Sequence, residues 1–385
     1  MTMSPLGPST LAVHAGAPSP RIEGSAVTPI FQGSVFEHTG ATEYSAIRYP
    51  RLSNLPSHRS VCAKLAALEG TEAALVTASG MAAITTAVFA VMAGGGHLLA
   101  QNTLYGGTFT FLRDVFKDIG FTYDLIDPTD PSSWEGKLRD DTLAIYTEAV
   151  GNPNLVVADH TAVVDFAQEH GLVSMIDSTF ASPVNFNPAA VGYDIVLHSA
   201  TKYLNGHSDL AAGVIAASEE WIDKIQPRLT HLGGTMDPHS CFLLERGIKT
   251  LVLRVERQNA NALAIAEHLE GNPAIDRVHY PGLESHKGHT IAKELFRGFG
   301  GMVTFEIKGD GAAAAAFIDR LRLPIHAPSL GGVESLVTRP VTTSHLAMTT
   351  DERAAAGMTE NMVRMSVGIE DVADLIADID QALAG

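Results

Sequence analysis

Cysteine is scarce in this chain, and a long apolar run is missing. Only Cys62 and Cys241 occur, too few for a disulfide framework and too far apart for Cys-x-x-Cys chemistry, which indicates a reducing compartment. No uncharged apolar stretch approaches the roughly 18 residues that span a bilayer. Residues 1–20 lack the basic and apolar regions of a signal peptide. We therefore expect a cytoplasmic protein with no membrane partner.

Positive charge is also in short supply. Lys and Arg total 26 against 43 Asp and Glu, and the net charge of −17 disfavours nucleic acid as a partner. The G-x-G-x-x-G, Walker A and H-E-x-x-H motifs are absent. The 16 histidines show no metal-ligand spacing, so we expect no metal site.

What the chain does contain is an alternation of short apolar strands and helices. We expect strands at 73–77, 97–101, 122–126, 143–147, 172–176, 195–197 and 213–217, with helices at 61–69, 81–92 and 161–169. Because many of these strands are apolar throughout, the pattern predicts an α/β fold with a mostly parallel sheet flanked by helices on both faces.

The pattern changes at both ends of this region. Residues 1–58 are rich in Pro, Gly, Ser and Thr, and we expect an extended N-terminal arm. After residue 238 we expect a long helix at 242–269, strands at 278–280, 302–307 and 363–367, and helices at 312–322 and 372–383. The predicted units are therefore the arm (1–58), a ligand-binding α/β domain (59–238) and a smaller α+β domain (239–385), in keeping with a chain too long for one compact unit.

A lysine follows one of the predicted strands. The segment His198–Tyr203 closes the apolar run 193–197 and places Lys202 beside the hydroxyls of Ser199 and Thr201. Such a lysine can form a Schiff base and the hydroxyls can hold an anion, two needs of a pyridoxal 5'-phosphate (PLP) enzyme. An ordinary surface lysine is the alternative. The Ser-x-x-Lys of penicillin-binding enzymes is a further match, but its companion motifs S-D-N and K-T-G are missing.

Three other strand ends carry suitable groups. Asp177 ends the strand 172–176, where ligands bind in open α/β sheets, and can pair with a pyridine nitrogen or simply cap a turn. Gly80 and Met81 open a helix whose free N–H groups attract phosphate, although many turns contain Gly. Tyr105 can stack on a ring or merely pack.

Together with further motifs, these residues resemble the Cys/Met-metabolism family of PLP enzymes, which contains cystathionine γ-synthases, cystathionine β- and γ-lyases, methionine γ-lyases and O-acylhomoserine sulfhydrylases. The motifs are Ser79-Gly80-Met81, Leu104 to Gly107, Glu148 with Asn152-Pro153, Asp177-Ser178-Thr179, His198 to Tyr203 with Gly206-His207, Arg246 to Leu251, Ser329 to Gly332, and Arg364 to Gly368. The resemblance covers nearly the whole chain. It implies the PLP fold type I, PLP as cofactor and a small amino acid as substrate.

The resemblance also implies roles by position. Lys202 is similar to the lysine that holds PLP and shuttles protons, Asp177 to the partner of the pyridine nitrogen, and Tyr105 to the stacking ring. The phosphate and its surroundings are implied to contact Gly80, Met81, Thr179, Ser199 and Thr201. Arg364 matches the clamp for the substrate carboxylate, a task that suits a planar fork, with Asn152 and Ser329 as its helpers.

In this family a Tyr-x-Arg pair reaches the cofactor phosphate of a neighbouring subunit. Tyr49-Pro50-Arg51 fits this pattern, with Arg51 three residues before Asn54, whereas Tyr44 and Arg48 lie nearby without fitting it. Tyr49 is also expected near the substrate. The resemblance thus implies a shared active site and a homo-oligomer, a dimer of dimers as in most family members.

Three departures bear on the subfamily. Asn54-Leu55-Pro56 replaces the usual Asn-Pro-Thr, Gly107 stands where methionine γ-lyases typically carry cysteine, and Pro328 stands where many cystathionine γ-lyases carry glutamate. Ala327-Pro328-Ser329 and the segment 232–238 are more similar to plant-type γ-synthases.

The reaction that the resemblance implies lies at the γ-carbon of a homoserine- or homocysteine-derived amino acid. We favour γ-replacement of the cystathionine γ-synthase type in sulfur amino-acid metabolism. The alternative is a cystathionine or methionine γ-lyase reaction that yields 2-oxobutanoate and ammonia. A PLP aminotransferase or decarboxylase, or a non-catalytic relative, is the competing class, and the Tyr-x-Arg and Arg364 patterns argue against it.

Overall fold

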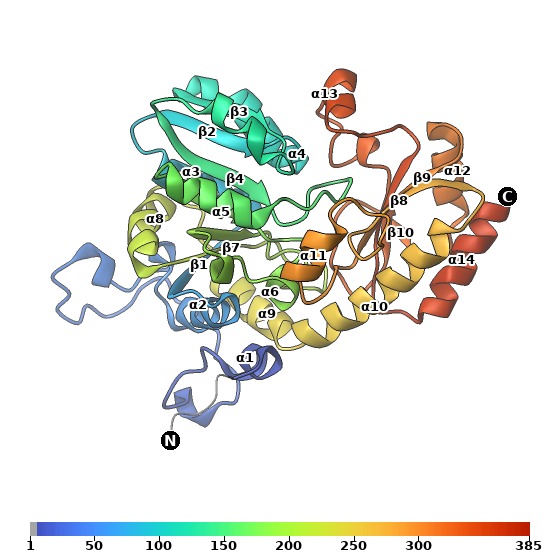
Figure 1. Cartoon of the computed structure of the whole chain (residues 1–385). Helices are drawn as coiled ribbons and strands as arrows, with labels where there is room; N and C mark the ends of the chain where they lie inside the picture. Colours follow the sequence, from blue (N-terminus) through green and yellow to red (C-terminus); the bar gives the residue numbers. More distant parts are fainter. Residues whose placement is uncertain (1–5) are drawn as a thin grey trace.

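Two β-sheets organise the chain in its computed structural model, which describes residues 6–385 (Figure 1). The large sheet has the strand order β1-β7-β6-β5-β4-β2-β3 and the small sheet the order β10-β11-β12-β9-β8. The strands are β1 (Ala73–Thr77), β2 (Gly96–Gln101), β3 (Phe121–Ile126), β4 (Thr142–Glu148), β5 (Val173–Asp177), β6 (Ile195–His198), β7 (Gly213–Ala217), β8 (Ile275–His279), β9 (Met302–Ile307), β10 (Ile325–His326), β11 (Leu336–Thr338) and β12 (Met362–Ser366).

Helices cover these sheets. They are α1 (Pro8–His14), α2 (Pro56–Glu69), α3 (Gly80–Val91), α4 (Gly106–Thr110), α5 (His160–Glu169), α6 (Ser182–Asn185), α7 (Pro188–Val191), α8 (Glu219–Leu232), α9 (Pro238–Ile248), α10 (Leu251–Glu270), α11 (His289–Leu295), α12 (Gly311–Arg320), α13 (Thr350–Ala355) and α14 (Val372–Ala384). Among residues 6–385, no helix is long and apolar enough to cross a membrane.

The large sheet confirms the predicted α/β architecture. All neighbouring strands pair in parallel except β7, which runs antiparallel to both β1 and β6. One apolar core packs α2 and α5 against one face of the sheet, and a second packs α3 and α8 against the other. Because both faces are covered, most strands away from the edge strand β3 are buried along nearly their whole length rather than on alternate residues.

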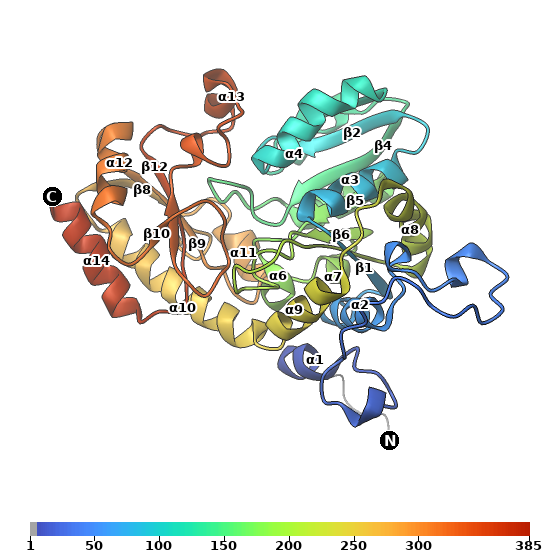
Figure 2. The same cartoon turned by 180° about the vertical axis from the view of Figure 1, so that it is seen from behind.

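The small sheet is mixed, and it packs with α10, α12 and α14 around a third core. Only β10 and β11 pair in parallel. Helix α10 runs along one side of the molecule from the large-sheet part to the small-sheet part (Figure 1, Figure 2). A smaller, mixed C-terminal unit is therefore present, while the domain boundaries after residues 58 and 238 stay predictions.

The single helix predicted at 242–269 is wrong, because two helices, α9 and α10, occupy this region. The break lies at Thr250, whose backbone leaves the helical region at φ −109° and ψ 8°. Its hydroxyl donates to the carbonyl of Gly247 at 3.2 Å and accepts from Arg254 Nε at 3.2 Å. Side-chain hydroxyls compete in this way with the helical backbone.

The N-terminal arm was expected to be extended, yet it begins with the short helix α1, which packs near α2 and α10. Between α1 and α2 the chain contains only three short 3-10 turns. Part of this segment, drawn in blue, projects away from the sheets (Figure 1). A projecting arm of this kind is available to contact a second subunit.

Candidate active site

A cavity of about 1030 Å³ lies where β4, β5 and β6 end and α3 begins. The pairing register sets Glu148 beside Asp177 and Asp177 beside Leu197, so the ends of these parallel strands meet at one edge of the sheet. Residues that follow β10 and residues on β12 close the opposite side. All the predicted site residues line this cavity except Tyr49 and Arg51.

Lys202 lies in the turn after β6 and reaches across the cavity. Its Nζ donates a 2.6 Å hydrogen bond to Oγ of Ser329. Burial, and next the positive charge of Arg364, lower the pKa of the Lys202 ammonium to about 8. A much larger share of this amine is therefore neutral near physiological pH than for an exposed lysine, and the neutral form is the one that attacks an aldehyde.

Arg364, on β12, is buried and points its guanidinium into the same cavity. Its Nη1 donates to Oδ1 of Asn152 at 2.8 Å, and its Nη2 donates to the carbonyl of Ser329 at 3.4 Å. Burial lowers the pKa of Arg364 to about 10, so the group stays charged at neutral pH. Its Nε has no partner within residues 6–385, which leaves donor capacity for a carboxylate.

Asp177 ends β5 as a buried carboxylate. Its Oδ1 accepts the backbone N–H of Thr179 at 2.9 Å, and the Thr179 hydroxyl in turn accepts the N–H of Ser199 at 2.7 Å. Burial raises the pKa of Asp177, because the charged form has lost water. A protonated ring nitrogen next to this carboxylate would offset that cost.

The start of α3 forms an anion site beside Ser199. Ser79 caps the helix by accepting the N–H of Ala82 at 3.1 Å, which leaves the first N–H groups of the helix free. A Cβ on Gly80 would lie 2.7 Å from Cβ of Ser199, so only glycine lets the two segments approach this closely. Free N–H groups at a helix start together with a hydroxyl suit a phosphate.

Thr201 lines the cavity, but its hydroxyl is engaged elsewhere. Its Oγ1 accepts the N–H of Ala212 at 2.9 Å and donates to the Ala212 carbonyl at 3.2 Å. These bonds connect the turn that carries Lys202 to Ala212, the residue directly before β7. A contact between Thr201 and a phosphate therefore stays a prediction.

Tyr105 precedes α4 and is held by its backbone. Its N–H donates to Oε1 of Glu148 at 2.6 Å, and Glu148 is itself buried at the end of β4. Burial, and next the charge of Asp177, raise the pKa of Glu148 well above its ordinary value. The Tyr105 ring lies over Gly107, where a Cβ would come within 2.5 Å of the ring.

Tyr49 and Arg51 lie at the 3-10 turn Pro50–Leu52 that precedes α2, and neither lines this chain's cavity. Arg51 Nη2 donates to the Tyr44 hydroxyl at 2.9 Å, Nη1 donates to the carbonyl of Thr230 at 3.3 Å, and the guanidinium sits over the Tyr49 ring. Arg51 therefore does not reach the phosphate site of its own subunit. The predicted contact with a neighbouring subunit stays a prediction.

Sequence reasoning missed part of the site. The sequence places Glu148 in a motif but assigns it no role, and its bond to Tyr105 joins residues 43 positions apart, which no local pattern encodes. The segment 342–347 also lines the cavity and was not predicted. Its residues carry no recognisable motif, and it meets the cavity only because the small sheet packs against the large one.

These groups together provide what PLP requires: an amine, a carboxylate for the ring nitrogen, a phosphate site at a helix start and an aromatic ring. The buried Asp177, which forms no ion pair among residues 6–385, and the partly desolvated Lys202 are the two observations that favour this fit.

Comparison with known proteins agrees with this geometry. The chain is 40% identical to L-methionine gamma-lyase of Pseudomonas putida, over 98% of this chain and 97% of the relative, and 39% identical to the chloroplastic cystathionine gamma-synthase 1 of Nicotiana tabacum, over 97% and 71%. A crystal structure of cystathionine gamma synthase from Xanthomonas oryzae pv. oryzae in complex with cystathionine matches with a TM-score of 0.95 and 37% identity, covering 99% and 98% of the two chains. The family model described as Cys/Met metabolism PLP-dependent enzyme matches residues 9–384, and the chain belongs to this family of enzymes.

Proposed function

We propose that the enzyme acts at the γ-carbon of a homoserine- or homocysteine-derived amino acid and exchanges the γ-substituent for a thiol. The observation that carries this proposal is the meeting of Lys202 and Arg364 at Ser329, which binds the amine through its hydroxyl and the guanidinium through its carbonyl. One group can hold a substrate α-carboxylate while the other faces the adjacent α-carbon. An α-amino acid is the substrate class that this pair fits.

When bound, PLP supplies an electron sink for the bonds at the α-carbon. In our proposal Lys202 takes the α-proton on its Nζ and later returns it, acting as base and then as acid. Ser329 orients that amine, and Asn152 orients the Arg364 fork that grips the carboxylate. Asp177 would hold the ring nitrogen of PLP in its protonated form, and Tyr105 would supply an aromatic surface for the ring.

The size of the cavity supports replacement. Its volume of about 1030 Å³ lies just above the usual range for small-molecule sites, about 300–1,000 Å³, and leaves room for a second small reactant beside PLP and the first amino acid. A thiol such as cysteine could then add where the γ-substituent has left. This is the cystathionine γ-synthase type of reaction.

A second reaction, γ-elimination to 2-oxobutanoate and ammonia, is favoured by the uncharged character of most of the cavity lining. Apart from Glu148, Asp177, Lys202 and Arg364, the side chains that line the cavity in this chain are uncharged, among them Thr110, Phe180, Pro328, Leu330 and Leu346. Such walls suit an uncharged γ-substituent, for example a thiomethyl group, better than the charged end of a second amino acid. Relatives of about 40% identity include enzymes named for either reaction.

One assay panel separates these reactions. The PLP-loaded enzyme is given methionine, homocysteine, cystathionine and O-acylated or phosphorylated homoserine, each with and without cysteine. Cystathionine formed only when cysteine is present supports replacement, whereas 2-oxobutanoate formed without a thiol identifies elimination. Conversion of PLP to the pyridoxamine form by amino acid alone would instead identify an aminotransferase.

We further propose that the enzyme works as a homo-oligomer in the cytoplasm. Tyr49 and Arg51 do not line the cavity of their own subunit, and Arg51 is held against α8, which supports delivery of both to the cavity of a neighbour. Both cysteines are free of disulfides, as expected in a reducing compartment. Sedimentation of the purified enzyme tests the assembly, and a monomeric active form would contradict it.

A further inference from the structure

One wall of the cavity mouth comes from a segment that crosses between the two sheets. We name residues 342–349 the rim segment; it leads from the 3-10 turn after β11 to α13. Five of its members line the cavity, namely Thr342, Thr343, Ser344, Leu346 and Ala347. Leu346 is 65% exposed and also lines the cavity, so its side chain lies where the cavity opens to solvent. The width of the mouth therefore depends on how this segment is held.

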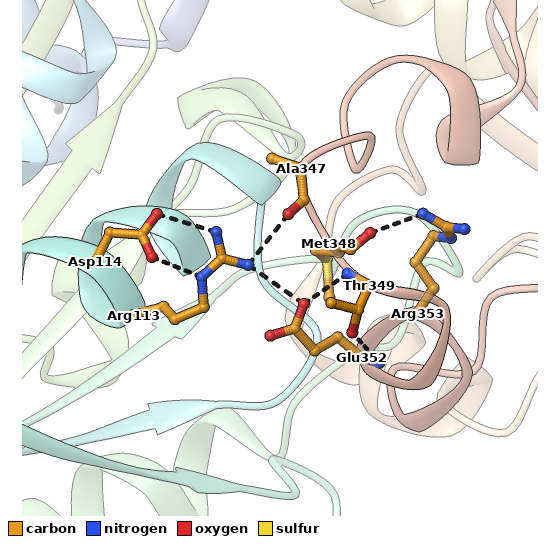
Figure 3. Close-up of polar contacts among 7 residues, drawn as sticks. All are labelled: Arg113, Asp114, Ala347, Met348, Thr349, Glu352 and Arg353. Carbon is orange, nitrogen blue, oxygen red and sulfur yellow. Dashed lines mark hydrogen bonds and ion pairs between the residues drawn. The ribbon is translucent and has the colours of Figure 1, made fainter.

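Arg113 holds the far end of the rim segment. It lies in the π-helical turn Phe111–Val115 that follows α4, on the large-sheet side (Figure 3). Its Nη1 donates to the carbonyl of Ala347 at 3.1 Å and to Oε2 of Glu352 at 3.3 Å. Its Nε and Nη2 donate to the two carboxylate oxygens of Asp114 at 2.7 and 3.0 Å, which fixes the plane of the guanidinium.

Glu352 links this contact to the start of α13. The same Oε2 that accepts from Arg113 also accepts the N–H of Thr349 at 2.7 Å, and the Thr349 hydroxyl accepts the N–H of Glu352 at 3.2 Å (Figure 3). This reciprocal pair is a capping box. Arg353 adds a bond from Nη1 to the Met348 carbonyl at 2.7 Å. The last residues of the rim segment are thus bonded on two sides.

The near end of the rim segment is attached beside Tyr105. The buried His345 places Nε2 3.1 Å from the carbonyl of Leu104, and because a carbonyl only accepts, this nitrogen carries the proton. Burial lowers the pKa of His345 to about 4, so the ring is neutral at physiological pH. Gly106 lies so close to the Ser344 carbonyl that a Cβ would be 2.0 Å from that oxygen. Leu346 therefore sits between two fixed points.

We propose that Arg113 is a positioning residue that holds Leu346 and Ala347 at the cavity mouth and thereby limits the length of the γ-substituent that the site accepts. The Arg113 side chain is 29% exposed, and a partly exposed ion pair contributes little to stability. Its bond to a backbone carbonyl of the rim segment instead fixes a position. The proposal rests on the proposed function, because it takes the substrate to be bound with its γ-substituent toward this mouth.

The test measures binding of inert amino acids of increasing length: norvaline, norleucine, 2-aminoheptanoate and 2-aminooctanoate. Binding is followed by the change in visible absorbance of the PLP-loaded enzyme, which needs no reaction at the γ-carbon. In the natural enzyme we expect affinity to fall as the chain lengthens past the rim segment. In Arg113→Ala the two longest ligands should bind about 3- to 10-fold more tightly relative to norvaline, since a methylene in a fitted pocket changes discrimination by at least that factor.

Two further variants and a control make the outcome decisive. In Arg113→Lys the length dependence of affinity should lie between that of the natural enzyme and that of Arg113→Ala. An ammonium cannot reproduce the planar set of donors of a guanidinium. Leu346→Ala should extend the accepted length without touching Arg113. Arg139→Ala, which removes an exposed arginine paired with Asp124 on β3, should leave the length dependence unchanged.

The proposal is overturned if Arg113→Ala keeps the natural length dependence, or if Leu346→Ala does. It is also overturned if Arg113→Ala loses affinity for all lengths equally, which would mark a structural role. Because the ligands are not turned over at the γ-carbon, a failure of the proposed reaction appears separately, in the assay panel. If no member of the series binds, the site does not accept α-amino acids and both proposals fall.

Discussion

Lys202 Nζ and Ser329 Oγ lie 2.6 Å apart although 127 residues separate them in the sequence. Lys202 follows a strand of the large sheet, whereas Ser329 follows β10 of the small one. Ser329 has φ 97°, a conformation that a residue with a side chain rarely adopts. Such backbone strain persists only when surrounding contacts hold it, here including the bond from Arg364 to the Ser329 carbonyl. The position of the amine therefore depends on the packing of one sheet against the other.

Removing either partner of this contact should have distinct effects. Lys202→Ala should remove the visible absorbance band that PLP has when it is bonded to Lys202 and lower kcat by at least about 10²- to 10⁴-fold, the usual contribution of a positioned acid–base group. Ser329→Ala should keep the absorbance but lower kcat by roughly tenfold, the value of one hydrogen bond to a charged group. Lys224→Ala, at an exposed ion pair on α8, is the control. Full activity in Lys202→Ala would refute the site.

The lowered pKa of Lys202 predicts a pH dependence of stability in the PLP-free protein. Burial, and then Arg364, lower this pKa from 10.5 to about 8. Between about pH 8 and pH 10.5 the unfolded chain binds more protons at this group than the folded one does, so the Lys202 contribution to the free energy of unfolding rises with pH. Below pH 8 the group is charged in both states and its burial is unfavourable.

Denaturant unfolding of the PLP-free protein and of Lys202→Met at several pH values checks this. The natural protein should gain stability relative to Lys202→Met as pH rises from 8 to 10.5, and their difference should be flat below pH 7. A difference that falls with rising pH would contradict the lowered pKa.

The rate at which the PLP-free protein binds PLP should rise over a range centred near pH 8, because only the neutral amine attacks an aldehyde.

Much of the fold could be predicted from the sequence because its strongest elements are local. Continuous apolar strands that alternate with helices specify a covered parallel sheet, and β1, β7 and β9 have the predicted bounds. The direction of β7 could not be predicted, because antiparallel pairing with β1 and β6 depends on the path of the chain and not on its composition. The break between α9 and α10 depends on one hydroxyl at Thr250 that competes with the backbone.

The site likewise contains residues that the local sequence predicts and residues that it does not. Gly80, Asp177 and Lys202 each follow a predicted strand, so their gathering at one edge follows from parallel topology. Only the family resemblance predicts that Arg364 belongs to the site, because nothing in the sequence of its own strand indicates that the side chain faces the large sheet. The contacts of the rim segment with Arg113 and Leu104 join residues about 240 positions apart, 234 for one and 241 for the other, and no local pattern encodes them.

Arg364 should determine the affinity for the substrate carboxylate. Arg364→Ala removes a charged hydrogen-bond donor and leaves Asn152 Oδ1 without its bond, so KM should rise roughly 10- to 100-fold. Arg364→Lys should recover only part of this loss, because an ammonium cannot bind a carboxylate with two parallel bonds. Steady-state kinetics on the best substrate of the panel gives KM and kcat. An unchanged KM in Arg364→Ala would exclude the carboxylate role.

The shared active site can be tested by mixing two inactive variants. Lys202→Ala destroys a subunit's own cavity, whereas Arg51→Ala removes the group that we expect it to supply to its neighbour. In a mixed dimer one cavity then carries both defects and the other carries none, so an equal mixture should recover about a quarter of the natural activity. The variants are unfolded and refolded together, with each alone as control. No recovery would mean that Arg51 acts within its own subunit or not at all.

Gly107 should control the orientation of the Tyr105 ring. A Cβ at this position would lie 2.5 Å from Cε1 and 3.0 Å from Cζ of that ring, so any side chain forces the ring to shift. Because the Tyr105 backbone is fixed by Glu148, the shift must come from rotation of the side chain. Gly107→Ala and Gly107→Cys should therefore change the visible absorbance of bound PLP and lower kcat by roughly tenfold, an overpacking cost of about 1–3 kcal/mol.

The matched control is Gly136→Ala, at a position where an added Cβ meets no atom within 4 Å. Tyr105→Phe serves as a second comparison, because it keeps the ring and its backbone bond while removing the hydroxyl. If Gly107→Ala leaves both absorbance and kcat unchanged while Tyr105→Ala alters them, the ring accommodates the methyl group. The glycine would then not be what holds Tyr105 against the cofactor.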